Sequence, residues 1–182
     1  MSNEWPTRRE VYSGRIVKLG LETATMPNGM ELELEIVRHQ GAAAVIAVTA
    51  AQEIVLLRQY RHAAGGEIYE IPAGVKDHGE EPLQCAKREL LEEAQYVSER
   101  FVHLGHILST PGFCDERLDL YAALDIQPGE GSPDEDEFIS EIRLLPLQEA
   151  QQWIEDGKIV DAKSICAIAK YIFWKNKQSE DT

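Results

Sequence analysis

A helix pattern that begins at Pro82 constrains this chain more than any other sequence feature. Proline is favoured at the first position of a helix, and acidic residues just before it interact well with the positive end of the helix dipole. Apolar residues then recur at steps of three and four, which is typical of an amphipathic helix with one buried face. That face comprises Leu83, Ala86, Leu90, Ala94 and Val97, with Leu91 at its edge.

Three glutamates, Glu89, Glu92 and Glu93, fall on one arc beside this apolar face. Like charges one helical turn apart destabilise a helix by a few tenths of a kcal/mol per pair, at roughly 0.2–0.5. The repulsion becomes attraction when a divalent cation lies among them, because hard cations such as Mg²⁺ bind oxygen ligands. In a chain of net charge −14, a solvated helix face is the alternative explanation for adjacent glutamates.

The glutamates belong to a longer pattern with the spacing G-x5-E-x7-R-E-x2-E-E. Its members are Gly74, Glu80, Arg88, Glu89, Glu92 and Glu93. Six fixed matches arise by chance in about one of 10⁵ chains of this size, given ordinary residue usage. The pattern resembles the Nudix box, and the resemblance implies a Nudix hydrolase. The family box continues with a glycine, where this chain has Gln95, so the turn after the helix stays open.

The resemblance implies an α/β fold, a Nudix α/β/α sandwich with a mixed sheet, and a site for two to three Mg²⁺ or Mn²⁺ ions. We expect the metal ligands to be Glu89, Glu92, Glu93 and the backbone carbonyl of Ala73. Arg88 and Glu80 are expected to brace the loop and the helix. At roughly 100° per residue, Arg88 should lie on the other side of the helix from the metal-facing glutamates.

The rest of the chain alternates between strand and helix patterns, as expected for a sheet covered by helices. We predict two parts, an N-terminal β segment of residues 1–41 and a Nudix domain of residues 42–182. The N-terminal part reads as a half-exposed hairpin around Pro27-Asn28-Gly29. Further strands are expected at 42–48, 53–62, 103–110, 118–126 and 139–146, and further helices at 147–159 and 161–177.

Several motifs outside the box resemble the ADP-ribose pyrophosphatase branch of the Nudix hydrolases. They are RQYR (Arg58–Arg61), EIPAG (Glu70–Gly74), STPGFCDE (Ser109–Glu116) and the acidic run before Phe138. The resemblance makes Arg61 a phosphate contact, a task that suits its planar guanidinium. It also makes Glu116 a substrate-facing acid, while Arg58 is a weaker candidate for substrate binding.

The acidic run supplies a further carboxylate in related enzymes. Glu137 is favoured because it immediately precedes a strand, and Glu135 remains an alternative. Glu137 is accordingly a candidate metal ligand as well. A carboxylate from Glu137, Glu135 or the box glutamate Glu92 would position or deprotonate the attacking water.

The expected reaction is metal-dependent hydrolysis of the pyrophosphate bond of ADP-ribose and related nucleoside diphosphate sugars. The products would be a nucleoside monophosphate and a sugar phosphate. Two alternatives stay open: a Nudix-like sensor that binds a nucleotide sugar without cleaving it, and a Nudix enzyme for nucleoside triphosphates or dinucleoside polyphosphates. Some relatives clamp adenine between aromatic residues, at places that Ile16 and Leu34 take here, so relaxed base selection is expected.

Composition narrows the partners and the location. With 18 Lys and Arg against 32 Asp and Glu, the surface repels nucleic acids and anionic membranes. The start of the chain has no apolar signal region, and no apolar run is long enough for a bilayer, so a cytoplasmic protein is expected. The three cysteines read as free thiols. A homodimer is expected, with residues of about 10–38 covering a partner subunit, since an isolated hairpin is marginal.

Overall fold

The computed structural model describes residues 8–132 and 138–180 and centres on a seven-stranded sheet. The main path of this sheet is β12-β5-β4-β10-β9, with β6 paired to β5 and β7 paired to β4. Strands β4 and β10 are parallel and the other pairs are antiparallel, so the sheet is mixed. The strands are β4 (Ala42–Val48), β5 (Glu53–Arg61), β6 (Gly66–Glu70), β7 (Ala73–Val75), β9 (Arg100–Leu108), β10 (Arg117–Leu124) and β12 (Ile139–Pro146).

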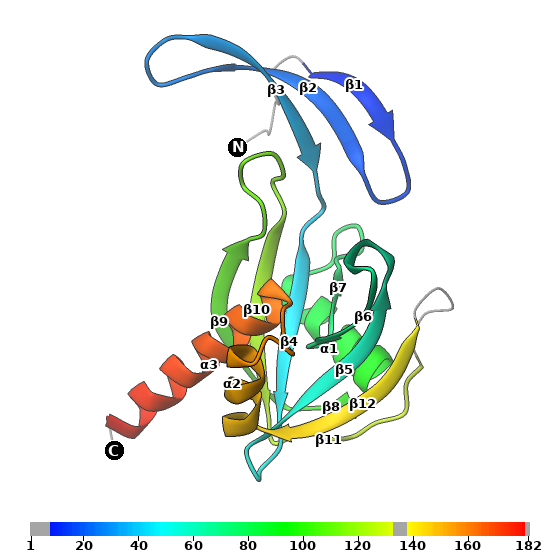
Figure 1. Cartoon of the computed structure of the whole chain (residues 1–182), viewed down its shortest axis with the longest axis vertical. Helices are drawn as coiled ribbons and strands as arrows, with labels where there is room; N and C mark the ends of the chain where they lie inside the picture. Colours follow the sequence, from blue (N-terminus) through cyan, green and yellow to red (C-terminus); the bar gives the residue numbers. More distant parts are fainter. Residues whose placement is uncertain (1–7, 133–137, 181–182) are drawn as a thin grey trace.

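Helices cover both faces of this sheet, as Figure 1 shows. On one face, α1 (Pro82–Ala94) packs Leu90 and Ala86 against Val45 and its neighbours. On the other face, α2 (Leu147–Glu155) and α3 (Ala162–Glu180) pack against the alternate residues of the same strands. Strand β4 is buried along its whole length because its two faces meet different helices. The predicted α/β/α sandwich with a mixed sheet is confirmed.

A separate three-stranded sheet stands at one end of the molecule (Figure 1). It consists of β1 (Arg8–Ser13), β2 (Lys18–Thr25) and β3 (Glu31–Arg38). The predicted hairpin is present as β2 and β3, whose turn includes Gly29 with φ +83°. Strand β1 was not predicted from the sequence. Along β3 the apolar residues are only half-buried, so this sheet retains an incompletely covered apolar face.

Helix ends differ from the sequence-based expectation for a local reason. Helix α1 ends at Ala94, and Gln95 adopts the left-handed conformation (φ +60°) that a glycine would favour there. Helix α2 ends at Glu155 rather than near residue 159, and Gly157 (φ +70°) turns the chain. Helix α3 begins at Ala162, and the Asp161 carboxylate accepts the backbone N–H of Ser164 at 2.9 Å.

Short elements complete the described chain: the 3₁₀ turn η1 (His62–Ala64) and the strands β8 (Tyr96–Val97) and β11 (Gln127–Pro128). The cysteines are free thiols, as predicted. Cys85 lies on the buried face of α1, and this burial raises its pKa to about 12, so the thiol stays protonated and unreactive at neutral pH. Within the described part of the chain, no helix combines the length and apolar character needed to cross a bilayer.

Candidate functional site

A cleft of about 870 Å³ opens where the N-terminal sheet, β7, the β9–β10 turn and the start of α3 come together. Three residues singled out in the sequence, Arg61, Ala73 and Glu116, line it together with Gly74. They come from three separate segments, namely the end of β5, strand β7 and the turn between β9 and β10. The other lining residues are Arg15, Ile16, Ala42, Val75, Ile107, Leu108, Ser109, Leu118, Asp161, Ala162, Lys163 and Cys166.

The box glutamates meet the floor of this cleft through two close contacts. The backbone N–H of Ala73 donates to Oε2 of Glu93 at 2.8 Å. The backbone of Gly74 lies so near Glu89 that a Cβ built there would stand 1.8 Å from Oε1. The glycine of the box therefore leaves room for the Glu89 carboxylate, which any side chain at this position would displace.

Burial distinguishes the three glutamates. Glu93 is 1% exposed and Glu89 is 6% exposed, whereas the side chain of Glu92 is 33% exposed. Burying ionised carboxylates is unfavourable unless cations or N–H donors compensate them. The two buried carboxylates beside a cleft are thus suited to binding a cation, and a solvated face does not describe them.

Arg88 corrects one sequence-based expectation. It braces Glu80, as predicted, with Nε at 3.1 Å from Oε1 and Nη2 at 3.1 Å from Oε2. Its Nη1, however, also donates to Glu89 at 2.7 Å and to Glu92 at 3.0 Å. The prediction that it lies away from the glutamates was wrong, because a long arginine side chain curls back to reach residues i+1 and i+4.

These contacts shift the ionisation of the brace. The hydrogen bond with Glu80 raises the pKa of the Arg88 guanidinium, and the same bond lowers the pKa of the Glu80 carboxyl. Both groups therefore stay charged across the physiological range, and Arg88 offsets part of the repulsion among the glutamates.

The residues present fit a divalent cation by their chemistry. Glu89, Glu92 and Glu93 supply the hard oxygen donors that Mg²⁺ and Mn²⁺ take. Among residues 8–132 and 138–180, no three Asp, Glu, His or Cys side chains converge closely enough to form a complete ligand set. Arg88 bridges two of these carboxylates, since its Nη1 lies 2.7 Å from Glu89 and 3.0 Å from Glu92.

Two arginines of the RQYR motif point to different environments. Arg61 lines the cleft, and its Nε donates to the buried Glu70 at 2.8 Å. Arg58 lies outside the cleft lining and pairs with Glu67 at 2.9 Å. Residues three apart on a strand face opposite sides, so the strand period separates the two.

Glu116 reaches the cleft from the turn between β9 and β10. The imidazole Nε2 of His39 lies 3.6 Å from its Oε1. The turn is tied to the end of β3, because the N–H of Val37 donates to the carbonyl of Phe113 at 2.7 Å and the N–H of His39 donates to Asp115 at 2.8 Å. Nothing in the local sequence around His39 predicts this contact.

Glu135 and Glu137 lie outside the residues that the structure describes. Their strand neighbour β12 begins at Ile139 and pairs with β5, the strand that carries Arg61.

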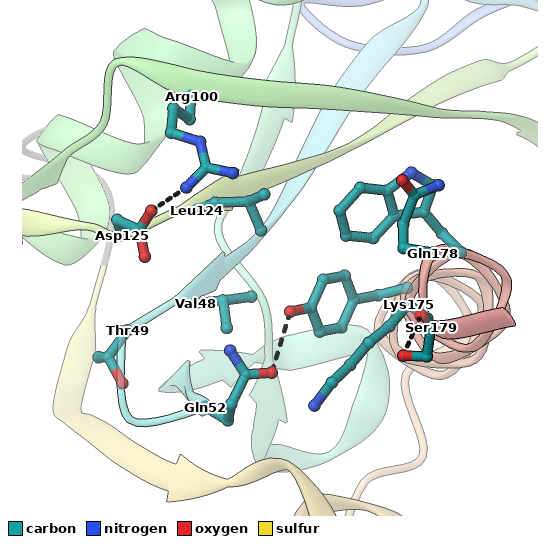
Figure 2. Close-up of a pocket in the computed structure, with 11 residues that line it drawn as sticks. Val48, Thr49, Gln52, Arg100, Leu124, Asp125, Lys175, Gln178 and Ser179 are labelled. Atoms are coloured by element: carbon teal, nitrogen blue, oxygen red, sulfur yellow. Dashed lines mark hydrogen bonds and ion pairs between the residues drawn. The ribbon is translucent and has the colours of Figure 1, made fainter. Parts of the chain in front are cut away.

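A second cavity of about 640 Å³ lies at the opposite end of β4, beside α3 (Figure 2). An ion pair of Arg100 with Asp125 and a hydrogen bond from Tyr171 to Gln52 border it. It contains none of the residues singled out as catalytic or metal-binding, so the chemistry is assigned to the cleft at β7.

Comparisons with known proteins agree with this arrangement. The profile of the NUDIX domain matches residues 38–167. The chain is 43% identical over 161 residues to the methanol dehydrogenase activator of Bacillus methanolicus, covering 87% of this chain and 86% of the relative. It is 36% identical over 163 residues to the ADP-ribose pyrophosphatase of Bacillus subtilis, covering 88% of each.

A third relative, the ADP-ribose pyrophosphatase of Mycobacterium tuberculosis, is 31% identical over 160 residues, which is 87% of this chain and 77% of the relative. Among solved structures, a crystal structure of an ADP compounds hydrolase superposes with a TM-score of 0.81 over 98% of both chains at 22% identity, which shows the same fold. The box residues, the sandwich fold and these matches together make the chain a member of the Nudix family and a Nudix pyrophosphohydrolase.

Proposed function

We propose that this enzyme hydrolyses the pyrophosphate bond of ADP-ribose and related nucleoside diphosphate sugars, with a divalent cation as cofactor. The main support for this proposal is the cleft that Arg61, Glu116, Ala73 and Gly74 line together. The buried Glu89 and Glu93 contact the backbone of its Ala73–Gly74 segment. Relatives that are named ADP-ribose pyrophosphatases at 36% and 31% identity support the choice of substrate.

The residues of the chain divide the work. Arg61 offers a planar guanidinium to the phosphates from the wall of the cleft. The candidates for holding the substrate and orienting a water molecule are Glu116, Glu92 and the loop carboxylate Glu137, with Glu135 as the alternative to Glu137. Two to three Mg²⁺ or Mn²⁺ ions would be held by Glu89, Glu92, Glu93, Glu137 and the carbonyl of Ala73. When bound, such ions polarise the phosphoryl oxygens and lower the pKa of water.

The substrate range follows from the other end of the cleft. Ile16 lines the cleft, and Leu34 lines a neighbouring cavity of about 410 Å³. Stacking of a base on an aromatic side chain contributes about 1–3 kcal/mol. Aliphatic residues at these two places would weaken the selection for adenine without affecting recognition of the phosphates.

A panel of nucleoside diphosphate sugars tests this function. With Mg²⁺, we expect ADP-ribose to give AMP and ribose 5-phosphate, and ADP-glucose, GDP-mannose and UDP-glucose to be cleaved less well but measurably. The products are identified by mass and kcat/KM is compared. A preference for ADP-ribose above about a thousandfold, roughly 4 kcal/mol, would reveal a base or ribose clamp, and no turnover of any member would favour a nucleotide-sugar sensor. Faster turnover of nucleoside triphosphates or dinucleoside polyphosphates would favour those substrate classes.

Glutamines in the acidic loop separate its two candidates. We expect Glu137→Gln to lower kcat by about a hundredfold or more with little change in KM, because a group that orients water acts mainly in the transition state. Glu135→Gln should behave like wild type. The reverse order would assign the role to Glu135, and two silent variants would move it to a box glutamate such as Glu92.

We also propose that residues 1–41 form a dimerisation segment and residues 42–182 the hydrolase domain. Large apolar side chains on the N-terminal segment are exposed, including Tyr12 at 59%, Ile16 at 62% and Val11 at 52%. We expect a homodimer mass by light scattering at micromolar concentration, because a partner subunit would cover these side chains. A monomer under these conditions would contradict the proposal. The free thiols fit a cytoplasmic location.

A second candidate role comes from the relative at 43% identity, which is named a methanol dehydrogenase activator. By that likeness, this protein would activate a methanol dehydrogenase. Adding the purified protein to such a dehydrogenase and measuring its alcohol oxidation rate would test this role, with Glu93→Gln as the comparison. An equal rate with and without the protein would exclude the tested dehydrogenase as a partner.

A further inference from the structure

Two cations from distant parts of the chain meet on one buried carboxylate at the cleft. Glu70, at the end of β6, is 4% exposed. Its Oε2 accepts a hydrogen bond from Nε of Arg61 at 2.8 Å, and its Oε1 accepts one from Nζ of Lys163 at 2.7 Å. Arg61 and Lys163 both line the cleft, whereas Glu70 lies behind them.

The position of Lys163 is fixed by the first turn of α3. Its Nζ also lies 3.1 Å from the Asp161 carboxylate, which caps the helix by accepting the N–H of Ser164. The hydroxyl of Ser164 in turn accepts the N–H of Ile71 at 2.9 Å. This hydrogen bond joins the start of α3 to the segment that leads into β7, and it therefore positions the backbone of Lys163 beside the cleft.

Both cations keep donors for a ligand. An ammonium group has three N–H donors, and the two carboxylate contacts of Lys163 engage at most two of them. Arg61 gives only its Nε–H to Glu70, and within the described chain its two terminal NH₂ groups have no protein acceptor. The two nitrogens sit on the two oxygens of one carboxylate, so they are at most about 8 Å apart, a separation that a diphosphate group can bridge.

Charge explains why two cations are needed. A single buried carboxylate beside Arg61 would neutralise most of its attraction for a phosphate. With Lys163 on the second oxygen, the charge of Glu70 is shared between two cations. The Arg61 guanidinium therefore keeps part of its positive potential toward the cleft.

We propose that Lys163 is a second phosphate-binding residue of this enzyme, acting beside Arg61, and that Glu70 is the positioning residue that holds both cations at the cleft. The ligand is the diphosphate group of the substrate. This inference rests on the proposed function and adds to it a residue from the last helix, which lies 102 positions after Arg61 in the chain.

The test compares Lys163→Met, Lys163→Arg and a control, Lys175→Met, on the same helix but at the second cavity (Figure 2). With ADP-ribose and Mg²⁺, we expect Lys163→Met to raise KM about tenfold with kcat within about threefold of wild type. Lys163→Arg should keep KM within about threefold, because it retains a cation. Lys175→Met should match wild type. Thermal melting checks that each variant is folded.

A purely structural ion pair predicts a different result, in which Lys163→Met melts earlier but keeps a wild-type KM, and this would overturn the inference. A KM raised equally in Lys175→Met would overturn it as well. Titration with inorganic pyrophosphate gives a readout that needs no turnover. We expect weaker binding to Lys163→Met than to wild type even if ADP-ribose proves not to be the substrate, and equal affinities or no binding to wild type would refute the phosphate site.

Discussion

Replacing Glu93 by glutamine is expected to lower kcat/KM for ADP-ribose by about a thousandfold or more, roughly 4 kcal/mol of transition-state stabilisation. Glu93 is 1% exposed and its Oε2 accepts the N–H of Ala73 at 2.8 Å. The glutamine side chain has the same size, and its amide oxygen can accept the same bond. The substitution therefore removes a negative charge at the centre of the glutamates while retaining the local packing.

Two measurements separate this charge effect from misfolding. Without metal, the melting temperature of Glu93→Gln should equal or exceed that of wild type, because repulsion from Glu89 is relieved. Calorimetric titration with Mn²⁺ should show weaker or fewer binding events than in wild type. Glu155→Gln, an exposed position on α2, serves as the matched control and should change neither quantity. Near-normal turnover of Glu93→Gln would remove Glu93 from the site.

Gly74→Ala is expected to lower turnover by about a hundredfold while leaving the protein folded. The added Cβ would stand 1.8 Å from Oε1 and 2.2 Å from Cδ of Glu89, so the carboxylate must move. Because these atoms are the far end of a flexible side chain, the fold can accommodate the methyl group by a rotation of Glu89. Displacement of a reacting or ligating group by about 1 Å can cost on the order of a hundredfold in rate.

Gly66→Ala is the control for this variant. Gly66 lies on β6, the strand that precedes β7 in the chain, and a Cβ added there meets open space. We expect it to keep wild-type kcat. Circular dichroism and melting curves should place both variants close to wild type. If Gly74→Ala retains full activity, the position of the Glu89 carboxylate does not matter to catalysis. A variant that fails to fold would instead show that the strand cannot yield at Gly74.

Much of the fold could be read from local patterns. The period of the apolar residues predicted α1, and apolar runs predicted the buried strands β4 and β5. The hairpin of β2 and β3 followed from alternation and a Pro-Asn-Gly turn. Strand β1 was not predicted from the sequence, because its six residues, RREVYS, are mostly polar and exposed. They form a strand through their pairing with β2.

The candidate site divides in the same way. Spacing along one helix identified Glu89, Glu92 and Glu93, and it identified the Arg88–Glu80 brace, because these residues lie within a short segment of chain. The helical angle between residues placed Arg88 on the side of the helix away from the glutamates, which was wrong. That angle gives the direction in which a side chain leaves the helix, whereas the long Arg88 side chain reaches back to Glu89 and Glu92. Spacing along the sequence could not predict two further features, which are the close approach of Gly74 to Glu89 and the contact of His39 with Glu116.

The family and the glutamates could be recognised from the sequence, because the box that carries them spans only residues 74–93. The sandwich was implied by that resemblance and agreed with the alternation of strand and helix patterns along the chain. Tertiary packing, by contrast, places Lys163 and Arg61 on the same carboxylate of Glu70 and brings the start of α3 to the cleft. Lys163 and Glu70 are 93 residues apart, and the packing of α3 on the sheet brings them together. Such a contact leaves no periodic trace in either segment, because each residue satisfies its own local structure whether or not the other is near.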